Sequence, residues 1–333
     1  MKVTMKEVAK LAGVGVGTVS RVLNDGSVKD STRKKVEAAI KELNYQPDIY
    51  ARGLKMNKTH TIALILPSVW NPFFSEFAFH VENTLESKNY KLYLCNSNGN
   101  SEKEREYIQM VTQNKVDGII GITYSDIDEY ISSNLPFVSI DRYFTEDVIY
   151  VTADNSTGGR LAVNELLARE CKHLGYIGGY QEIPNETKNR RKYFEIECKE
   201  KGVDYSVLDM LEPLVDLKLN VKRFLEENAN IDGIFTINDS LALEVCRILE
   251  ELGKKVPQDV QVIGFDGQRI HEGESYLVST IAQPVKEMAE KSVELLLSVI
   301  EGREVENRTV MPVSFKEAGT TKNTLKKESL DLI

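Results

Sequence analysis

The sequence predicts an α/β protein with a small all-helical head at its N-terminus and a larger body of two lobes. Within the first 24 residues, two short amphipathic segments flank a glycine-containing turn. From Thr61 onward, short apolar runs alternate with helix-length segments, which is typical of parallel sheets covered by helices on both faces. The chain has 333 residues, more than one ordinary domain contains. We therefore expect each lobe to be a doubly wound parallel sheet.

The head is expected to contain three helices. The first covers Met5 to Leu11 and begins with a capping box, in which Thr4 and Glu7 each satisfy a free backbone N–H of the other. A turn around Gly13 follows, and then a second short helix that carries Ser, Arg and Asn side chains. The third helix spans Ser31 to Asn44, with apolar residues at i, i+3, i+4 and i+7. Such a pair of helices around a turn is a helix-turn-helix, whose second helix enters the major groove of DNA.

The charge is divided unevenly along the chain and supports this interpretation of the head. The whole sequence has a net charge of −9, which by itself argues against a polyanionic partner. Residues 1–60 contain 12 Lys and Arg against 6 Asp and Glu, a net +6, so the remainder carries −15. A basic head on an acidic body confines phosphate attraction to one end. The alternative is a chance drift of a few charges in a window of this length.

A linker over residues 47–60 is expected between the head, residues 1–46, and the body. The third helix ends at Tyr45-Gln46-Pro47, because proline cannot continue it. The segment from Asp48 to Met56 contains Gly53, has little apolar surface to bury, and precedes a polar stretch. Alone in water this segment is a marginal helix, so we expect it to become helical only when something holds it.

The body contains seven apolar runs that read as buried strands, with helical segments between them. The predicted strands are Ile62–Leu66, Lys91–Cys95, Gly118–Ile122, Phe137–Ile140, Leu174–Gly178, Gly233–Ile237 and Val260–Phe265. The predicted helices are Phe74–Lys88, Glu102–Asn114, Thr157–Arg169, Ser240–Leu252 and Val285–Ile300. Ligands of such folds bind in the crevice at the carboxyl ends of the strands.

The composition predicts a soluble protein of the cytoplasm. Hydrophobic residues make up 41% of the chain and charged residues 28%. The longest conspicuous apolar run, Ile62 to Leu66, is far shorter than the ~20 residues of a membrane span, and the first residues lack an export signal. The cysteines have no CxxC spacing, so we expect reduced thiols and neither a structural metal nor a cofactor. They are Cys95, Cys171, Cys198 and Cys246.

Longer motifs over residues 3–321 carry a resemblance to a known family. They are TVSRVLN in the second helix, ELNYQP before the linker, ARGL within it, NPFF, VDGII, IDR, DNSTGGRLAV and VPQDVQVIGFDG in the body. A chain with these motifs resembles bacterial transcription regulators of the LacI/GalR family. The resemblance implies a body like that of periplasmic binding proteins, with an N-lobe of residues 61–153 and 284–311, a C-lobe of residues 154–283 and 312–321, and a tail of residues 322–333.

The resemblance also implies a homodimer whose two heads bind an operator of two-fold symmetry. Val16 and Gly17 match the positions that set base preference, and Arg21 can donate to guanine O6 and N7. Among the matched positions, three correspond to phosphate anchors (Thr4, Thr32, Tyr45) and one to the leucine that wedges into the minor groove (Leu54). The full set implied to contact DNA is Thr4, Val16, Gly17, Thr18, Ser20, Arg21, Asn24, Thr32, Tyr45 and Leu54.

Three departures from the family pattern affect these DNA contacts. Gly15 stands where relatives usually have serine, so the recognition helix lacks a side-chain N-cap. Asp48 stands where they usually have asparagine, and its negative charge opposes a phosphate contact. Val16 and Gly17 are small and apolar, which limits direct readout to thymine methyl groups and leaves more of the specificity to operator bendability.

For the body, the resemblance implies an effector site in the cleft between the lobes. Aromatic surface suits the apolar face of a sugar ring, while carboxylate, amide and guanidinium groups suit adjacent hydroxyls. Arg191 is an alternative to Arg190, because relatives usually have glycine at the position of Tyr193. The acid that relatives carry after the first body strand is replaced by Ser68. The implied contacts are Phe73, Phe74, Asp141, Arg190, Asn238, Asp266 and Gln283. Trp70, which lies in the same loop as Ser68, is a further candidate to line the cleft.

Several of these residues also have a purely structural interpretation. Without the resemblance, Trp70, Phe73 and Phe74 would be assigned to the core, where aromatic residues are most often found. Asp266 could cap a helix, and Arg21 could be a solvated surface charge. The three glycines of the first turn look like a phosphate-binding loop, but such a loop follows a strand, and here a helix precedes it.

The sequence predicts a repressor of a sugar-utilisation operon that a sugar in the cleft releases from its operator. We expect no enzyme, since the chain lacks a hydrolase elbow, a zinc-binding helix and a Walker loop. A secreted sugar-binding protein would share the body but not the head. Two alternatives stay open: a global carbon-catabolite regulator controlled by a phosphorylated partner protein, and a member that needs a corepressor. The sugar, the operator and the choice between dimer and tetramer are not fixed by the sequence.

Overall fold

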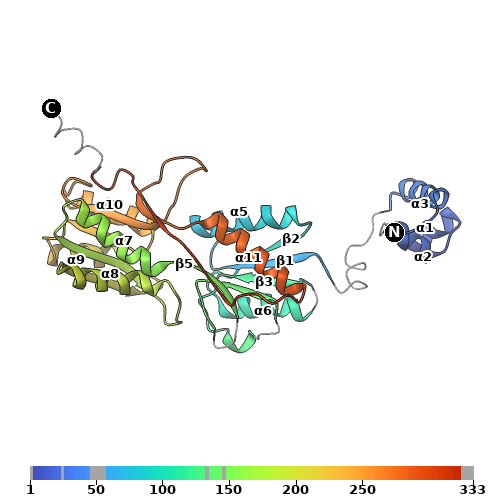
Figure 1. Cartoon of the computed structure of the whole chain (residues 1–333), viewed down its shortest axis with the longest axis horizontal. Helices are drawn as coiled ribbons and strands as arrows, with labels where there is room; N and C mark the ends of the chain where they lie inside the picture. The colour runs from blue at the N-terminus through green and yellow to red at the C-terminus, as the bar shows by residue number, and fades with distance from the viewer. Residues whose placement is uncertain are drawn as a thin grey trace. The chain divides into compact units, whose positions relative to one another are not determined.

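The computed structural model describes residues 3–23, 26–45, 58–113, 115–131, 135–144 and 148–323. They belong to two compact units, residues 1–60 and residues 61–333, which we call the head unit and the body (Figure 1). Asn24, most of the predicted linker with Asp48 and Leu54, and residues 324–333 of the predicted tail lie outside the described residues. Within these ranges, no helix combines the length and the apolarity that crossing a bilayer requires.

The head is a three-helix unit, as the sequence predicts. Its helices are α1 (Met5–Ala12), α2 (Val16–Leu23) and α3 (Asp30–Glu42). Val8, Val19 and Val36, one from each helix, are fully buried and belong to one hydrophobic cluster. Glu7 Oε2 accepts from the Thr4 backbone N–H at 2.7 Å and from the Thr4 hydroxyl at 2.8 Å. Gly13 ends α1 with φ of 66°, a left-handed conformation that favours glycine.

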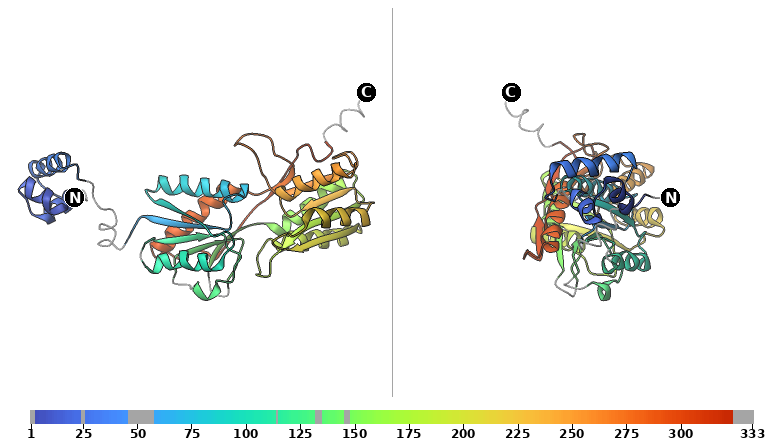
Figure 2. Two further views of the ribbon diagram at one scale, coloured as in Figure 1. Left: turned by 180° about the vertical axis from the view of Figure 1, so that it is seen from behind. Right: turned by 90° about the vertical axis from the view of Figure 1, so that its right-hand side faces the viewer.

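The first lobe is a six-stranded sheet in which every paired neighbour is parallel. Its order is β11-β5-β4-β3-β1-β2. Helices α5 and α11 pack together on one face, and α6 covers the other face (Figures 1 and 2). The elements are β1 (Thr61–Leu66), α5 (Pro72–Ser87), β2 (Lys91–Asn96), α6 (Ser101–Thr112), β3 (Gly118–Gly121), the short 3₁₀ helix η1 (Asp128–Tyr130), β4 (Phe137–Ile140), β5 (Ile149–Ala153), α11 (Val285–Ile300) and β11 (Arg308–Met311).

The second lobe is also six-stranded, with the order β12-β10-β9-β8-β6-β7. Only β12 is antiparallel to its neighbour among the described strands. The prediction of two doubly wound lobes is therefore confirmed. The elements are α7 (Asn155–Ala168), β6 (His173–Tyr180), α8 (Lys188–Lys201), β7 (Asp204–Leu211), α9 (Leu217–Glu227), β8 (Gly233–Thr236), α10 (Asp239–Glu251), β9 (Gln261–Asp266), β10 (Ser279–Ala282) and β12 (Ser314–Lys316).

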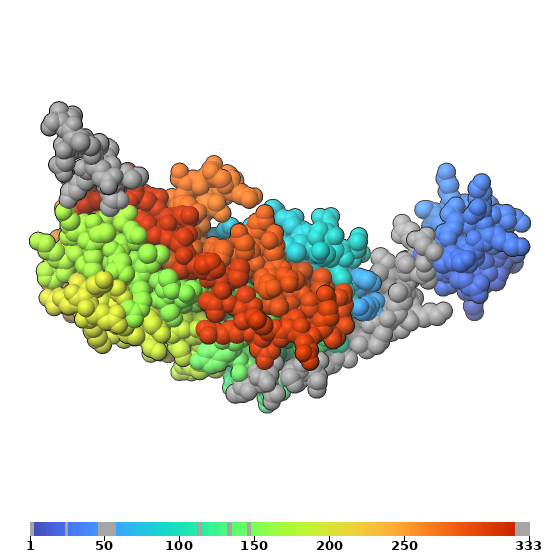
Figure 3. Space-filling view, viewed as in Figure 1, coloured from blue at the N-terminus to red at the C-terminus, as the bar shows by residue number. Residues whose placement is uncertain are grey.

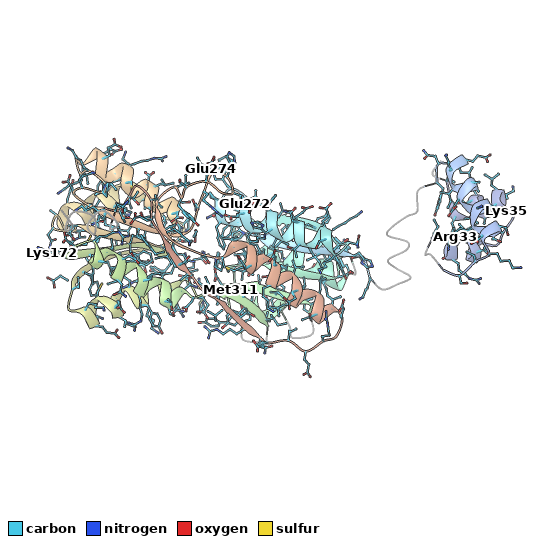
Figure 4. All side chains as sticks on the ribbon, turned by 45° about the horizontal axis from the view of Figure 1, so that its top comes forward. Arg33, Lys35, Lys172, Glu272, Glu274 and Met311 are labelled. Carbon is cyan, nitrogen blue, oxygen red and sulfur yellow. The ribbon has the colours of Figure 1, made fainter. Side chains whose placement is uncertain are left out.

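The chain passes between the lobes three times, so each lobe contains segments that are distant in sequence. The crossings run from β5 to α7, from β10 to α11 and from β11 to β12, where Met311 is labelled in Figure 4. In Figure 3 the orange-red surface of α11 adjoins the cyan surface of α5. Lys322, assigned to the tail from the sequence, donates its N–H to Gln261 at 2.8 Å and accepts from Arg169 at 3.0 Å. The ordered contacts of the body thus include Lys322.

A close approach of α7 and α8 fixes the start of α8. Gly159 faces the backbone of this helix, and a Cβ added there would lie 3.0 Å from the backbone nitrogen of Phe194 and against the carbonyl oxygen of Arg190. Glycine is required because only its absent side chain lets the two helices pack at this distance. The consequence is a fixed position for Arg190 at the edge of the lobe.

Candidate functional site

A cavity of about 770 Å³ lies between the two lobes, within the usual range for ligand pockets. Residues that follow the strands of both lobes line it, as expected for parallel sheets. The seven contacts that the resemblance implies all line it. They are Phe73, Phe74, Asp141, Arg190, Asn238, Asp266 and Gln283.

Arg190 is the fixed cation of the cavity, with only 4% of its surface exposed. Its Nε donates to Asn155 Oδ1 at 2.7 Å, and its Nη1 donates to the carbonyl of Ile237 at 2.7 Å. Nη1 also lies 3.4 Å from Asp266 Oδ1, and the guanidinium carbon is 3.7 Å from the centroid of the Phe265 ring. These contacts restrain the guanidinium in one orientation, which is the requirement for a preorganised hydrogen-bond donor.

Asp141 and Asp266 supply two buried acceptors whose charges interact with that of Arg190. Asp141 accepts from the Thr152 hydroxyl at 2.6 Å, and Asp266 accepts from Gln283 Nε2 at 2.8 Å. Both backbones have positive φ, 56° and 111°, a strained conformation that concentrates at functional sites. Burial raises the pKa of both carboxyl groups, that of Asp266 to about 6, although Arg190 opposes the rise.

The wall from the first lobe is built at the start of α5. Asn71 caps this helix by accepting from the Phe73 N–H at 2.9 Å, and Pro72 occupies its first position. Phe73 is 5% exposed and stacks on Phe77, so most of its ring belongs to the core. Phe74 meets Phe73 edge to face and is partly buried, so it offers more aromatic surface to the cavity.

Trp70 does not take the place that the sequence predicts. It is 93% exposed and is absent from the residues that line the cavity. Its backbone N–H donates to Ser68 Oγ at 3.1 Å, so the serine that replaces the expected acid shapes this loop locally. The structure therefore does not support Trp70 as a wall of the cavity.

The loop that carries Asp266 is held by a residue that the sequence analysis does not single out. Asn238 caps α10 by accepting from the Leu241 N–H at 2.8 Å, which is a structural role. The next residue, Asp239, is fully buried, and its Oδ2 accepts the backbone N–H groups of Gly267 and Gln268 at 2.9 and 2.7 Å. Asp239 is thus a positioning residue that holds the turn directly after Asp266.

Helix α2 of the head has one buried face and one face open to solvent. Val19 and Val22 are buried in the head core. Val16 is 41% exposed, and Gly17 and Arg21 are exposed, while Thr18 and Ser20 are half-buried at the edge of this face. The side chains that the resemblance assigns to base and phosphate contacts in this helix therefore share its accessible side.

The remaining predicted DNA contacts differ in their burial and in their structural roles. Thr4 caps α1 and Thr32 is half-buried in the first turn of α3. Tyr45 is 8% exposed and packs in the head core. Arg33, labelled in Figure 4, was not predicted: its Nη2 donates to the carbonyl of Gly26 at 3.0 Å and so restrains the chain between α2 and α3.

Further polar residues of the cavity come from positions that no motif marks. They are Tyr124, Gln181, Asp209 and Glu212. Burial raises the pKa of Tyr124, so its phenol stays protonated and can both donate and accept. Arg191, the alternative to Arg190, also lines the cavity but is 40% exposed, with Nη1 2.8 Å from Asp209 Oδ2 and Nε 2.7 Å from Glu195 Oε1. The buried, central guanidinium is that of Arg190.

Two segments of the chain match known protein families. Residues 4–48 match the family described as bacterial regulatory proteins, lacI family, and residues 163–321 match a periplasmic binding protein-like domain. The sucrose operon repressor of Pediococcus pentosaceus is 35% identical over 322 residues, which cover 95% of this chain and 98% of that protein. The ribose operon repressor of Halalkalibacterium halodurans is also 35% identical over 322 residues, 96% and 97% of the two chains.

Solved structures agree with this fold. The periplasmic binding protein/LacI transcriptional regulator from Alkaliphilus metalliredigens QYMF, complexed with D-xylulofuranose, is 31% identical with a TM-score of 0.71 and covers 79% of this chain and all of its own. The lac repressor dimer bound to operator and an anti-inducer has a TM-score of 0.84 at 22% identity over 97% of this chain, again covering all of its own. On the strength of near-complete coverage by relatives at 35% identity, the chain belongs to the lacI family of bacterial regulatory proteins.

Proposed function

We propose that this protein represses a sugar-utilisation operon and leaves its operator when a sugar occupies the cleft between the lobes. The observation that carries the proposal is the presence in one chain of a basic helix-turn-helix and a cavity lined by the buried Arg190, Asp141 and Asp266. The names of the relatives, sucrose and ribose operon repressors, support the same function.

The chemistry of the cavity favours a sugar over an apolar ligand. Asp141 and Asp266 accept hydrogen bonds from hydroxyl groups, and Arg190 donates to hydroxyl or ring oxygens. Phe74 contributes the flat apolar surface against which the C–H face of a sugar ring packs. Because each of these groups is held by other protein contacts before a ligand arrives, little ordering has to accompany binding.

Contacts between the lobes give the sugar a means of changing the protein's conformation. The Glu186 N–H donates to the Asp141 carbonyl at 2.8 Å, and Arg269 lies 3.3 Å from Glu76, in each case joining one lobe to the other. A sugar that contacts both lobes stabilises the conformation in which both lobes can bind it at once. Release from DNA follows if that conformation binds the operator less well. Switching the operator from mostly bound to mostly free requires at most a ~10⁴-fold preference.

We further propose that the protein acts as a homodimer, because two heads are needed to contact an operator of two-fold symmetry. The edge strand β2 exposes Tyr93 and Leu94 by 54% and 48%, and Phe79 on α5 is 57% exposed. Apolar side chains of this size on an edge strand and the helix beside it suit a surface that a second copy covers.

The test uses the full-length protein and a fluorescent operator duplex, selected from a random library by the protein itself. Fructose, glucose, ribose, sucrose and xylulose are titrated into the complex while anisotropy reports operator occupancy. At least one of these sugars should release the protein, and Asp141→Asn should keep operator affinity while losing the response. If none of them, nor a wider panel of sugars, changes occupancy, the proposed function is wrong.

A further inference from the structure

The segment between β6 and α8 contacts both the cavity and the opposite lobe. Its residues Asn185 and Thr187, with Lys188 at the start of α8, line the cavity, whereas Glu186 between them does not. Glu186 is nevertheless buried, with only 10% of its side chain exposed. No motif of the family resemblance includes Glu186, so its role has to be argued from its contacts.

Three contacts of Glu186 reach the first lobe. Its N–H donates to the carbonyl of Asp141, which follows β4, at 2.8 Å. Its Oε1 accepts from the Tyr150 hydroxyl of β5 at 3.3 Å and lies 3.5 Å from Arg308 Nη2 of β11. The other oxygen, Oε2, accepts from Asn189 Nδ2 of α8 at 2.6 Å, which orients the carboxylate. Glu186 therefore joins three neighbouring strands of one lobe to a helix of the other.

The first lobe offers Glu186 a hydroxyl group and a cation side by side. Strands β5 and β11 are parallel neighbours in which Tyr150 stands opposite Arg308, and the guanidinium carbon of Arg308 lies 5.9 Å from the centroid of the Tyr150 ring. Burial raises the pKa of Tyr150, and the charge of Glu186 adds to the rise although that of Arg308 opposes it. The phenol therefore keeps its proton and donates it to the carboxylate.

Lys188 makes a second contact across the same boundary. Its Nζ lies 3.1 Å from the Tyr143 hydroxyl and 5.7 Å from the centroid of that ring. The rings of Tyr143 and Tyr150 are 6.5 Å apart, so the contacts of Lys188 and Glu186 form one cluster. We call this cluster the interlobe latch and define it by Tyr143, Tyr150, Glu186, Lys188 and Arg308.

The interlobe latch forms only while the two lobes lie together. The Glu186 carboxylate is largely removed from water, and Tyr150 and Arg308 replace that water only while β5 and β11 lie beside it. When the lobes separate, all three groups are hydrated again, so the net gain is that of one hydrogen bond and one partly exposed ion pair. Such a gain changes an equilibrium constant by about three- to tenfold, which biases the arrangement of the lobes but leaves it reversible.

The interlobe latch and the sugar favour the same arrangement of the lobes. Glu186 bonds to the backbone of Asp141, a cavity acceptor whose φ of 56° is strained, so the contact between the lobes also holds this acceptor in place. A sugar that contacts Asp141 on one lobe and Arg190 on the other requires the same approach. Two interactions that stabilise one state strengthen each other. The latch therefore promotes sugar binding without contacting the sugar.

We infer that the interlobe latch sets how much sugar is needed to release the operator, with Glu186 as its central positioning residue. A strong latch populates the sugar-binding arrangement before the sugar arrives, whereas a weak latch keeps the protein on its operator until more sugar is present. The reason is that the apparent dissociation constant rises as the fraction of binding-competent protein falls. This inference rests on the proposed function and adds the contacts that tune its response.

The test uses Glu186→Gln and Tyr150→Phe in the full-length protein. Fructose, glucose, ribose, sucrose and xylulose are titrated into the operator complex, and anisotropy gives the midpoint of release. Both variants should raise this midpoint about three- to tenfold. Because coupling is reciprocal, their operator affinity without sugar should be equal to that of the wild type or higher. A substitution that merely damaged the fold would lower both affinities.

Glu200→Gln is the matched control for the loss of a carboxylate. Glu200 belongs to α8, as part of the same lobe, but pairs with Arg160 of α7 rather than with the first lobe. This variant should change neither the midpoint of release nor the operator affinity. The inference is overturned if the control shifts the midpoint as much as Glu186→Gln, if the latch variants leave it unchanged, or if they lower sugar affinity and operator affinity together.

Hydrogen exchange tests the latch without any sugar. The Glu186 amide is bonded to the Asp141 carbonyl, so its exchange rate reports contact between the lobes. Tyr150→Phe leaves the sequence around Glu186 unaltered, and exchange of the amides of residues 185–187, followed by mass spectrometry, should accelerate about three- to tenfold. Unchanged exchange overturns the latch whatever the sugars do. Faster exchange in a protein that no sugar releases from DNA supports the latch and refutes the proposed function instead.

Discussion

The substitution Asp266→Asn should stabilise the body while weakening its binding of sugar. Asp266 is 7% exposed and meets one cation, Arg190, at 3.4 Å and one amide donor, Gln283 Nε2, at 2.8 Å. Burial is the largest influence on its pKa and raises it, the charge of Asp141 raises it further, and Arg190 and Gln283 oppose the rise without cancelling it. The folded protein therefore holds an ionised carboxylate at a net cost.

The size of this cost follows from the pKa in the two states. The Asp266 pKa is about 6 in the folded protein and 3.8 for an ordinary aspartate, so the folded state binds the proton more tightly. The contribution of Asp266 to the free energy of unfolding is accordingly highest below pH 3.8 and is lost as the pH rises from 3.8 through 6. At pH 7.5 the loss amounts to about 3 kcal/mol, and at pH 4.5 to about 1 kcal/mol. Asparagine keeps the shape and removes the ionisation.

The assay is urea unfolding of the full-length protein by circular dichroism at both pH values, compared between wild type and variant. The variant should be more stable at pH 7.5 by up to about 3 kcal/mol, with a smaller difference at pH 4.5. Sugar affinity of the wild type should fall roughly tenfold between pH 7.5 and 5, because the acceptor becomes protonated, and the variant should show no such dependence. A variant that is less stable at pH 7.5, or a difference equal at both pH values, would refute this reasoning.

Three further predictions concern the head and the helix packing. Arg21→Ala should lower operator affinity by about 1–3 kcal/mol and relax base choice at one position in a binding assay on variant duplexes; an equal loss on every duplex would make Arg21 a phosphate contact. The Gly15 carbonyl accepts the Thr18 N–H at 2.9 Å, and nothing lies within 4 Å of a Cβ added at Gly15. Gly15→Ser should therefore cap α2 and raise the stability of the head by a few tenths of a kcal/mol in denaturant titrations. A decrease in stability would contradict the cap. Gly159→Ala should lower the free energy of unfolding by about 1–3 kcal/mol, since the added Cβ meets the backbone of α8. Gly17→Ala, with open space around the added Cβ, should not destabilise the protein. Equal effects of the two substitutions would contradict the packing argument.

Periodicity was a good guide where an element buries a clear apolar face. Strand β1 is buried along its length and matches the predicted run within one residue, and α5 begins two residues before the predicted Phe74 because Asn71 and Pro72 provide its cap. Strand β7 escaped prediction because it is an edge strand, half-exposed, with Asp204, Ser206 and Asp209 among its residues. Helix α8 escaped as well, since its charged sequence has little apolar periodicity and its packing depends on the glycines of α7.

For the cavity too, local sequence motifs predicted some of the residues, whereas residues whose roles depend on tertiary contacts were missed. Motifs predicted Asp141, Arg190 and Asp266, all of which line the cavity, because each belongs to a recognisable segment. The positioning role of Asp239 and the cavity residues Tyr124 and Asp209 were missed because they depend on which strands become neighbours, and a single sequence does not contain that information. Trp70 was assigned to the cleft because it lies in the same loop as Ser68, yet its side chain is exposed to solvent.

The central claim is that the basic head of the full-length protein recognises a two-fold symmetric duplex and that the body controls this recognition. The most direct measurement is the affinity for such a duplex, selected from a random library, relative to random duplex over a range of salt concentrations. We predict a marked preference for the symmetric site, with affinity for both duplexes falling steeply as salt increases. Equal affinity for the two duplexes, or binding that does not respond to salt, would contradict the account.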